Sequence, residues 1–188
     1  MQLITALNHL DLYIGIYKLC QKKWLKMFKH SFVYTVFEDF VEIDLKTKEK
    51  IKKMKLNKTK ENKNNFSLSP DINMKLKEII ESKLSFIFDK LKLTLQNCWV
   101  QKYNKYDYHS MHTHFHTQHD YSFIWYIEGG PDSACTKFFD VGYPLINTGS
   151  VLEFNFKPGM VLLFPGFLPH EVPINKSNNR LVVSGNLI

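Results

Sequence analysis

Histidine side chains crowd into one short stretch of this sequence. Five of the eight histidines fall within eleven residues, and they are His109, His112, His114, His116 and His119. The imidazole nitrogen is a common ligand for transition metals, and residues two apart in a β-strand project from the same face. His112 and His114 can therefore direct two imidazoles at one ion. We expect a metal site here, with His116 competing for one of the two places because it shares their face.

A distant residue completes the candidate ligand set. His170 lies 56 residues after His114 and begins a predicted strand. With His112 and His114 it gives three nitrogen ligands, a set that fits Fe(II) and also Zn(II), Mn(II), Ni(II) or Cu(II). No cysteine is near in the sequence, so a structural zinc–thiolate site is not indicated. Three protein ligands leave open coordination positions, which is typical of a catalytic metal.

Three neighbouring residues are secondary candidates. His109 and His119 lie on the opposite face if the strand is regular. Asp120 is a possible carboxylate ligand, so the ion has either three histidine ligands or two histidines with Asp120 or water completing the coordination. The alternative to a metal site is a polar stretch that binds metal adventitiously.

Arg180 is the single arginine in a chain whose other long cations are all lysine. It follows His170 by ten residues and could lie on the next strand, directed into the same barrel. The planar guanidinium binds a carboxylate through two parallel hydrogen bonds. A metal with open positions beside such an arginine predicts a site for a keto-acid, whereas the alternative is an ordinary surface arginine.

These residues are positioned by a series of short strands. From residue 97 onward the sequence period changes to two, and turn signals such as Pro158-Gly159 separate the segments. Eight strands in about ninety residues favour a double-stranded β-helix, or jelly roll. The strands are predicted at residues 98–103, 108–114, 122–127, 136–139, 151–154, 160–164, 170–173 and 181–184. We expect a mostly β protein with one domain and a metal-binding core over residues 96–188.

The preceding residues, 1–95, are expected to flank this core with α-helices, one strand and a connector. Residues 70–91 carry one apolar stripe at helical spacing, and Pro70 suits the first helical position. Residues 32–37 are β-branched and aromatic, which is typical of a strand. Residues 1–28 also show helical spacing.

Charge is concentrated in the lysine-rich segment 46–63, in a chain of net charge +7. A basic run of this kind can bind phosphate backbones. It contains no aromatic residue to stack on bases, and we interpret it as a solvated, partly disordered loop. Nucleic acid is therefore not indicated beyond this one stretch.

Composition sets the broad class. The chain has 188 residues, of which 44% are hydrophobic, and no apolar run long enough to span a membrane. The first residues include Asp11 and lack a basic start, so we expect no signal peptide. The three cysteines, Cys20, Cys98 and Cys135, are widely spaced, which favours a reducing, cytoplasmic setting.

Four segments, in this order and at these spacings, resemble the Fe(II)/2-oxoglutarate-dependent oxygenase superfamily. Residues 103–114 read Tyr-x-x-Tyr-Asp-Tyr-His-x-x-His-x-His and are similar to the entry into its first metal-ligand motif. Residues 122–127 are similar to its next strand, and residues 157–170 to the strand and turn before the distal histidine. Residues 180–186 are similar to the strand that carries the 2-oxoglutarate-binding arginine.

The chain also departs from the usual pattern of this superfamily. The usual His-x-Asp/Glu is here His112-Thr113-His114, which is similar to a subgroup found in marine bacteria and their phages. Relatives often carry glycine at the position of Tyr106. The segment before Ser122 is slightly long, so His114 and His116 are an alternative register.

The resemblance implies a dioxygenase that uses Fe(II), 2-oxoglutarate and O2. It would hydroxylate an unknown organic substrate and release succinate and CO2. The implied metal ligands are His112, His114 and His170, and the implied co-substrate residues are Arg180, Ser184 and Tyr103.

Two other classes remain open. A cupin is also a jelly roll with His-x-His and a distant histidine, and the spacing of Gly159, Pro165 and His170 is close to its second motif. Its first motif would need a glutamate four or five residues after His114, where this chain has glutamine and histidine, and Arg180 would be unexplained. The third class is a structural β-protein with an adventitious histidine cluster.

Overall fold

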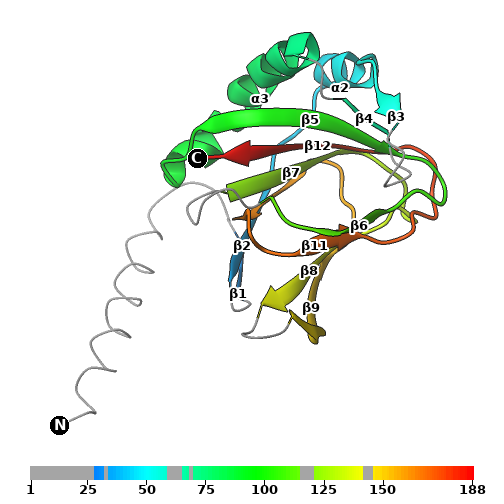
Figure 1. The fold of residues 1–188 in the computed structure, drawn as a ribbon. Helices are drawn as coiled ribbons and strands as arrows, with labels where there is room; N and C mark the ends of the chain where they lie inside the picture. The colour runs from blue at the N-terminus through cyan, green and yellow to red at the C-terminus, as the bar shows by residue number, and fades with distance from the viewer. Residues whose placement is uncertain (1–27, 32–33, 59–64, 68–69, 115–120, 142–145) are drawn as a thin grey trace.

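Two antiparallel sheets face each other in the computed structural model, which describes residues 28–31, 34–58, 65–67, 70–114, 121–141 and 146–188 (Figure 1). The larger sheet has eight strands in the order β1-β2-β10-β7-β12-β5-β4-β3, and the smaller has four in the order β6-β11-β8-β9. Strands far apart in the sequence alternate in space, as in a double-stranded β-helix. The predicted fold class is confirmed.

All eight strands predicted for the second half are present. They are β5 (Leu95–Tyr103), β6 (His109–His112), β7 (Tyr121–Glu128), β8 (Thr136–Val141), β9 (Ile146–Phe154), β10 (Met160–Pro165), β11 (His170–Val172) and β12 (Arg180–Leu187). Six are longer than predicted, whereas β6 and β11, the two that carry histidines, are shorter.

Four further strands from the first half extend the large sheet at both of its edges. They are β1 (Phe28–Ser31), β2 (Thr35–Phe40), β3 (Asn57–Lys58) and β4 (Asn65–Ser67). The single strand predicted over residues 32–37 is corrected to a β1–β2 hairpin, in which β2 begins at Thr35. The helix expected near the N-terminus falls in residues 1–27, which lie outside the described residues.

We predicted a loop over the whole lysine-rich segment 46–63, and this prediction is wrong for its first part. That part belongs to α2 (Leu45–Lys52), which begins at the N-cap Asp44. The Asp44 carboxylate accepts hydrogen bonds from the backbone N–H and the hydroxyl of Thr47 at 2.8 and 2.7 Å, and so satisfies a donor that a helix start leaves free.

Two lysines of α2 pair with the sheet. Lys48 and Lys52 lie 2.8 and 3.3 Å from the carboxylate of Glu128, at the end of β7. These two ion pairs attach α2 to the end of β7. The number of lysines in the segment does not by itself indicate this contact.

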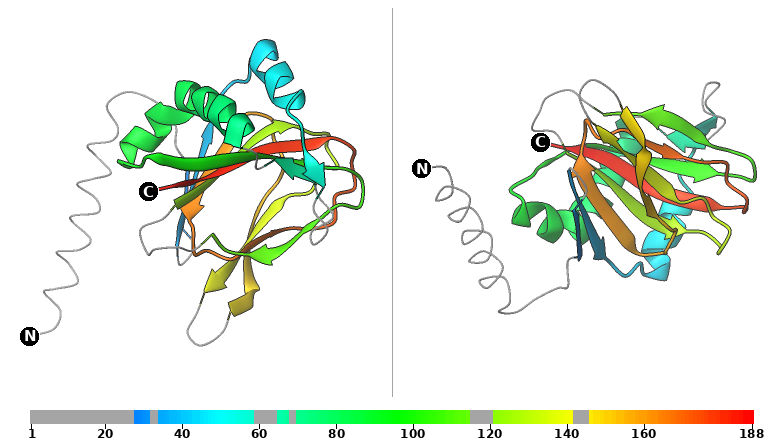
Figure 2. Two further views of the ribbon diagram at one scale, coloured as in Figure 1. Left: turned by 45° about the horizontal axis from the view of Figure 1, so that its top comes forward. Right: turned by 90° about the horizontal axis from the view of Figure 1, so that it is seen from below.

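α3 (Pro70–Lys90) begins at the predicted proline. Its apolar stripe packs on the large sheet, and four of its side chains are at most 1% exposed, namely Leu76, Ile80, Leu84 and Ile87. Both helices lie over the same outer face of the large sheet, away from the small sheet (Figure 2). Neither helix is both long and apolar enough to cross a membrane.

The central strands of the large sheet are covered on both faces. β10 and β12 are buried along their whole length. Val161 and Leu163 belong to the core under the helices, whereas Leu162 and Phe164 belong to the core between the sheets. Because side chains alternate along a strand, each central strand contributes one complete face to the barrel interior.

Three neighbouring strands present their inward residues in register. β12 pairs with both β5 and β7, so each of its inward residues lies between partners on either side. Four rows result, and we name them by their β12 member. They are Arg180 beside Tyr103, Val182 between Gln101 and Tyr126, Ser184 between Trp99 and Ile124, and Asn186 between Asn97 and Ser122.

The turn before β10 requires a glycine. Gly159 has a φ of +89°, in the left-handed region, and a Cβ there would lie 3.1 Å from the carbonyl oxygen of Val41. Its own N–H donates to the carbonyl of Tyr126 at 2.8 Å. The Pro158-Gly159 turn was predicted from the sequence, and it aligns the strand that leads to His170.

Candidate metal centre

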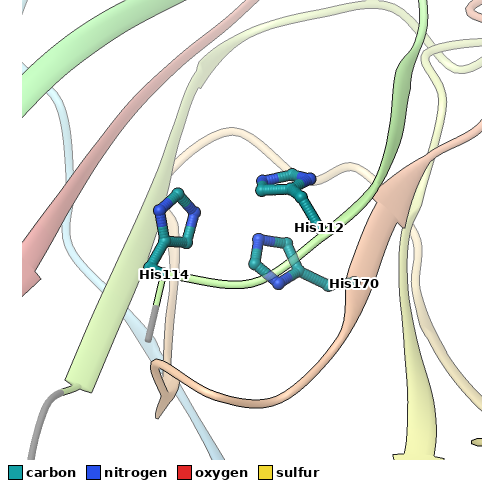
Figure 3. A group of neighbouring side chains, drawn as sticks. All are labelled: His112, His114 and His170. Carbon is teal, nitrogen blue, oxygen red and sulfur yellow. The ribbon is translucent and has the colours of Figure 1, made fainter. Parts of the chain in front are cut away.

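Three histidines meet where β6 pairs with β11 (Figure 3). His112, the last residue of β6, is the cross-strand partner of His170, the first residue of β11. One ligating nitrogen from each of His112, His114 and His170 lies within 4.8 Å of the other two. The structure thus brings together all three predicted ligands.

His114 reaches the group from outside the strand. β6 ends at His112, two residues earlier than predicted, so strand alternation does not explain the position of His114. Its backbone N–H instead donates to the carbonyl of Gly166 at 2.7 Å. This bond ties the segment after β6 to the loop that leads into β11.

Backbone carbonyls select the tautomers of two of these rings. His112 Nδ1 lies 2.8 Å from the carbonyl oxygen of Ser110, and His170 Nδ1 lies 2.9 Å from that of Leu168. A carbonyl can only accept, so each Nδ1 must carry the proton. Nε2 then keeps its lone pair, which is the arrangement of a metal-binding histidine held by an outer hydrogen bond.

Burial keeps these imidazoles neutral. It lowers the pKa of His170 well below its usual value, and the adjacent His112 and His114 lower that pKa further. Burial also lowers the pKa of His112. Neutral imidazole is the form that binds a metal ion, so both lowered pKa values favour the metal-binding form of His112 and His170.

His109 lies on the same side as His112, not on the opposite face as predicted. The two rings stack with centroids 3.8 Å apart. The pairing of β6 with β11 shifts register, because His112 opposes His170 while His109 opposes Val172. This β-bulge inserts one extra residue into β6 and turns both histidines inward.

His109 holds the opposite tautomer from its neighbours. Its Nδ1 lies 3.3 Å from Nε2 of Gln101, an amide nitrogen that can only donate. The proton of His109 therefore sits on its Nε2, and burial lowers its pKa to about 3. A ring in this state offers no lone pair to the ion, which separates His109 from the three candidate ligands.

A small chamber lies between these histidines and the large sheet. Its cavity volume is about 20 Å³. That is room for an ion or one water, but a keto-acid would need its walls to move. Rings line it, among them those of Phe164 and His170, whose centroids are 4.8 Å apart.

Arg180 is fully buried one row beyond the chamber. Its Nε donates to the carbonyl of Ala134 at 2.9 Å and its Nη2 to the hydroxyl of Thr136 at 3.4 Å. Nη1 has no hydrogen-bond partner in the described part of the chain. The guanidinium carbon lies 4.6 Å from the ring centroid of Tyr103, which itself lines the chamber. Tyr103 therefore contacts both the arginine and the metal side of the cavity.

Ser184 faces the chamber directly. Its hydroxyl donates to Oε1 of Gln101 at 3.2 Å, and the same amide contacts His109. Gln101 was not among the predicted residues, because a glutamine in a strand carries no distinctive signal. Its place follows from the register of β5 with β12.

The side chain of Asn175 links the backbone segments that surround Arg180. It is completely buried, and its Oδ1 accepts from the N–H of Ala134, whose carbonyl receives Arg180. Its Nδ2 donates to the carbonyls of Tyr103 and Ser177 at 3.3 and 2.7 Å.

We expect Asn175→Ala to lower the free energy of unfolding by about 2–4 kcal/mol, because buried backbone groups would lose their partners. Urea denaturation measures this change. Asn178→Ala, at an exposed position three residues on, is the matched control and should change stability by less than about 0.5 kcal/mol. Equal effects of the two substitutions would contradict the role of Asn175.

Three predicted candidates fall outside the described residues. They are His116, His119 and the possible carboxylate ligand Asp120. The alternative register that uses His116 therefore stays untested.

The sequence itself finds no match, since no protein-family model fits it and no curated protein is detectably similar. Solved structures match the fold. HygX from Streptomyces hygroscopicus, with nickel, 2-oxoglutarate and hygromycin B bound, has a TM-score of 0.64 at 10% identity and covers 81% of this chain and 82% of that chain. The non-heme α-ketoglutarate-dependent epimerase SnoN from nogalamycin biosynthesis has a TM-score of 0.62 at 10% identity, over 80% and 77% of the two chains.

A Pseudomonas putida prolyl-4-hydroxylase also matches, with a TM-score of 0.56 at 14% identity over 82% of this chain and 92% of that chain. These likenesses extend over most of each chain. They show that the protein has the double-stranded β-helix fold of 2-oxoglutarate/Fe(II) oxygenases.

Proposed function

We propose that this protein is an Fe(II)- and 2-oxoglutarate-dependent dioxygenase that hydroxylates a small organic substrate. His112, His114 and His170 would hold the iron. Arg180 would hold the far carboxylate of 2-oxoglutarate, with Tyr103 and Ser184 lining the co-substrate site.

The observation that carries this proposal is the donor set. One nitrogen from each of three buried or half-buried imidazoles lies within 4.8 Å of the other two, and two of these rings have Nδ1 committed to a backbone carbonyl. Three nitrogen donors fit Fe(II) and leave positions for other ligands. The residues present therefore fit a resident metal ion.

The fit of the keto-acid rests on Arg180. A buried guanidinium with an unpartnered Nη1, and with no ion pair among the described residues, provides a donor and an uncompensated positive charge for a carboxylate. The ring of Tyr103 fills the space next to it, so binding would require this ring to turn aside. Arg180 and Tyr103 would then orient the co-substrate rather than react with it.

When bound, iron, 2-oxoglutarate and O2 would supply the oxidation of a substrate C–H bond, with release of succinate and CO2. The chain's own part is to hold these groups and to exclude water. Phe138 and Phe164, both fully buried against His170, would keep that side of the chamber dry.

Loading the protein with Fe(II) under anaerobic conditions, then adding 2-oxoglutarate and O2, should produce succinate. Slow succinate formation is expected even without the organic substrate, and it can be followed by mass spectrometry. Zn(II)-loaded protein is the matched control, since zinc has no redox chemistry and should give only the background. Keto-acid binding and turnover that stay at background with iron fully bound would favour the cupin alternative.

The setting of the reaction is part of the proposal. The bound hygromycin B in HygX and the biosynthetic role of SnoN support a small organic substrate here. The two described cysteines, Cys98 and Cys135, are both free, which fits a reducing cytoplasm.

A further inference from the structure

Another cavity lies between the two helices, on the outer face of the large sheet. Its volume is about 480 Å³, which is within the range of small-molecule sites. One side is formed by the end of α2 and the residues that follow it, and the other by the first half of α3. An ion pair of 2.8 Å between Lys83 and the cap residue Asp44 joins the two helices. We call this cavity the interhelix groove.

Lysine side chains surround the interhelix groove. Three of them, Lys50, Lys53 and Lys55, come from the α2 side, and Lys75 comes from α3. Residues 50 and 53 are three apart and so project from the same side of their helix. All four side chains are exposed. Four ammonium groups around one hollow raise the local concentration of anions there.

The positive charge belongs to the surrounding sequence as well as to the lining. Residues 46–79 contain eleven lysines and four acidic residues. Among the described residues that line the groove, Glu78 is the one acid. The helix dipole accounts for part of this arrangement, since cations near the C-terminal end of α2 stabilise that helix. It does not account for Lys75, which lies in the second turn of α3, nearer the positive end of that helix.

The floor of the groove is apolar. Met54 and Ile79 line it, and both are half-buried and pack against the core under the helices. Contact with this close-packed core gives the floor a defined shape. Methionine also makes favourable contacts with aromatic rings through its sulfur. The groove thus combines cations around its edge with a surface on which a flat ring can lie.

We propose that the interhelix groove binds a nucleoside polyphosphate, with the phosphates among the four lysines and the base against Met54 and Ile79. Each phosphate oxygen accepts hydrogen bonds, and each ammonium supplies three donors and a positive charge. A carboxylate can only accept, so Glu78 suits the ribose hydroxyls rather than the phosphates. A nucleic-acid strand fits less well, because its affinity comes from a long series of phosphate contacts, whereas these lysines surround a single hollow.

This site is separate from the metal centre. Both helices lie on the outer face of the large sheet, away from the small sheet, whereas the chamber beside the three histidines is on the inner face (Figure 2). A nucleotide in the groove therefore does not contact the histidines. Its binding requires neither iron nor 2-oxoglutarate, so the test of this site is independent of the proposed oxygenase reaction.

Titration calorimetry on the full chain tests the site, in the presence of EDTA so that no metal ion bridges protein and nucleotide. The probes are ATP, ADP, adenosine and inorganic tripolyphosphate. We expect the affinity to fall from ATP to ADP and to be lost with adenosine, which has no phosphate. Tripolyphosphate should bind more weakly than ATP, because it has no base to lie on the floor. Binding of adenosine or tripolyphosphate as tight as that of ATP would overturn the proposal.

A short DNA duplex, of about 12 base pairs, tests the other class of phosphate-bearing ligand. In about 0.15 M NaCl, which screens contacts outside the groove, it should displace ATP less effectively than ADP does. Displacement as effective as that by ADP, or more so, would overturn the proposal in favour of a nucleic-acid surface.

Substitutions on the two sides of the groove test the residues. Lys53→Ala and Lys75→Ala should each weaken ATP binding about 2- to 5-fold, the range expected for exposed ion pairs, and the double variant should weaken it further. Lys77→Ala is the matched control, since it removes the same charge from α3 at a position where the lysine pairs with Glu81 at 3.7 Å. It should change the affinity by less than about 1.5-fold. Equal effects of Lys75→Ala and Lys77→Ala would overturn the proposal, because net charge alone would then explain the binding.

Discussion

Replacing His170 with alanine is expected to abolish stoichiometric metal binding. His170 is 3% exposed and sits between His112 and two phenylalanine rings, so no other described side chain can take its place. Loss of even an outer partner of a metal ligand commonly costs 10- to 100-fold in affinity. Removal of a ligand itself should weaken Fe(II) or Ni(II) binding by more than about 100-fold. Metal content after anaerobic loading, measured by mass spectrometry, reports the effect.

His109→Ala is the sharpest control for this prediction. His109 stacks on His112 and lines the same chamber, but its tautomer offers the ion no lone pair. Metal content should therefore stay near one ion per chain in this variant. Retention of the metal by His170→Ala, or its loss in His109→Ala, would show that the ligand set is wrong. The gain in thermal stability on adding metal should follow the same pattern.

Arg180→Ala should leave metal binding intact and cost most of the affinity for 2-oxoglutarate. Truncating one partner of a buried, hydrogen-bonded charge pair costs about 2–5 kcal/mol, or about 30- to several-thousand-fold in affinity. Arg180→Lys should recover little, because an ammonium lacks the planar fork and the stacking on Tyr103. Titration calorimetry on Ni(II)-loaded protein measures both variants.

A smaller keto-acid separates the carboxylate contact from general damage. 2-Oxobutanoate keeps the chelating end but lacks the far carboxylate. It should bind to wild-type protein and to Arg180→Ala with similar affinity, while 2-oxoglutarate distinguishes them. Equal losses for both ligands would indicate that the substitution only disturbs the packing around Tyr103 and Tyr126. Equal affinity of 2-oxoglutarate for both proteins would contradict the assigned role.

The positions of the strands in the second half were predictable because these strands are short, apolar and separated by turn residues. The Pro158-Gly159 turn is one example, since the positive φ at Gly159 is a conformation that other residues rarely adopt. Tyr106 also has a positive φ, +72°, which the sequence did not reveal, and its N–H donates to the carbonyl of Asn175.

α2 was missed because its signal is electrostatic rather than apolar. Within the helix only Thr47 and Ile51 are buried, so an apolar stripe is barely present. Its stability comes from the Asp44 cap and from lysine pairs to Glu128, an acid 76 residues after Lys52. A pairing over that distance cannot be inferred from local composition.

The grouping of the three histidines was predictable from the sequence, whereas the rest of the chamber depended on register. Residue type, strand alternation and spacing singled out His112, His114 and His170, and the structure brings them together. The inward turn of His109 depends on a bulge, and the contribution of Gln101 depends on the pairing of β5 with β12. Strand pairing across the barrel is a property of the whole fold, so neither residue could be placed beforehand.

The bulge in β6 also bears on how related chains should be aligned. In a regular strand, two residues on one face are separated by one position, yet here His109 and His112 share a face with two positions between them. A chain with one residue fewer at this point would restore a regular ladder and keep the same inward pair. In this strand, His-x-x-His with the bulge and His-x-His without it would therefore place the same two histidines, those at positions 109 and 112, on the inward face. A motif search with fixed spacing would separate proteins that differ by a single-residue deletion and share one site.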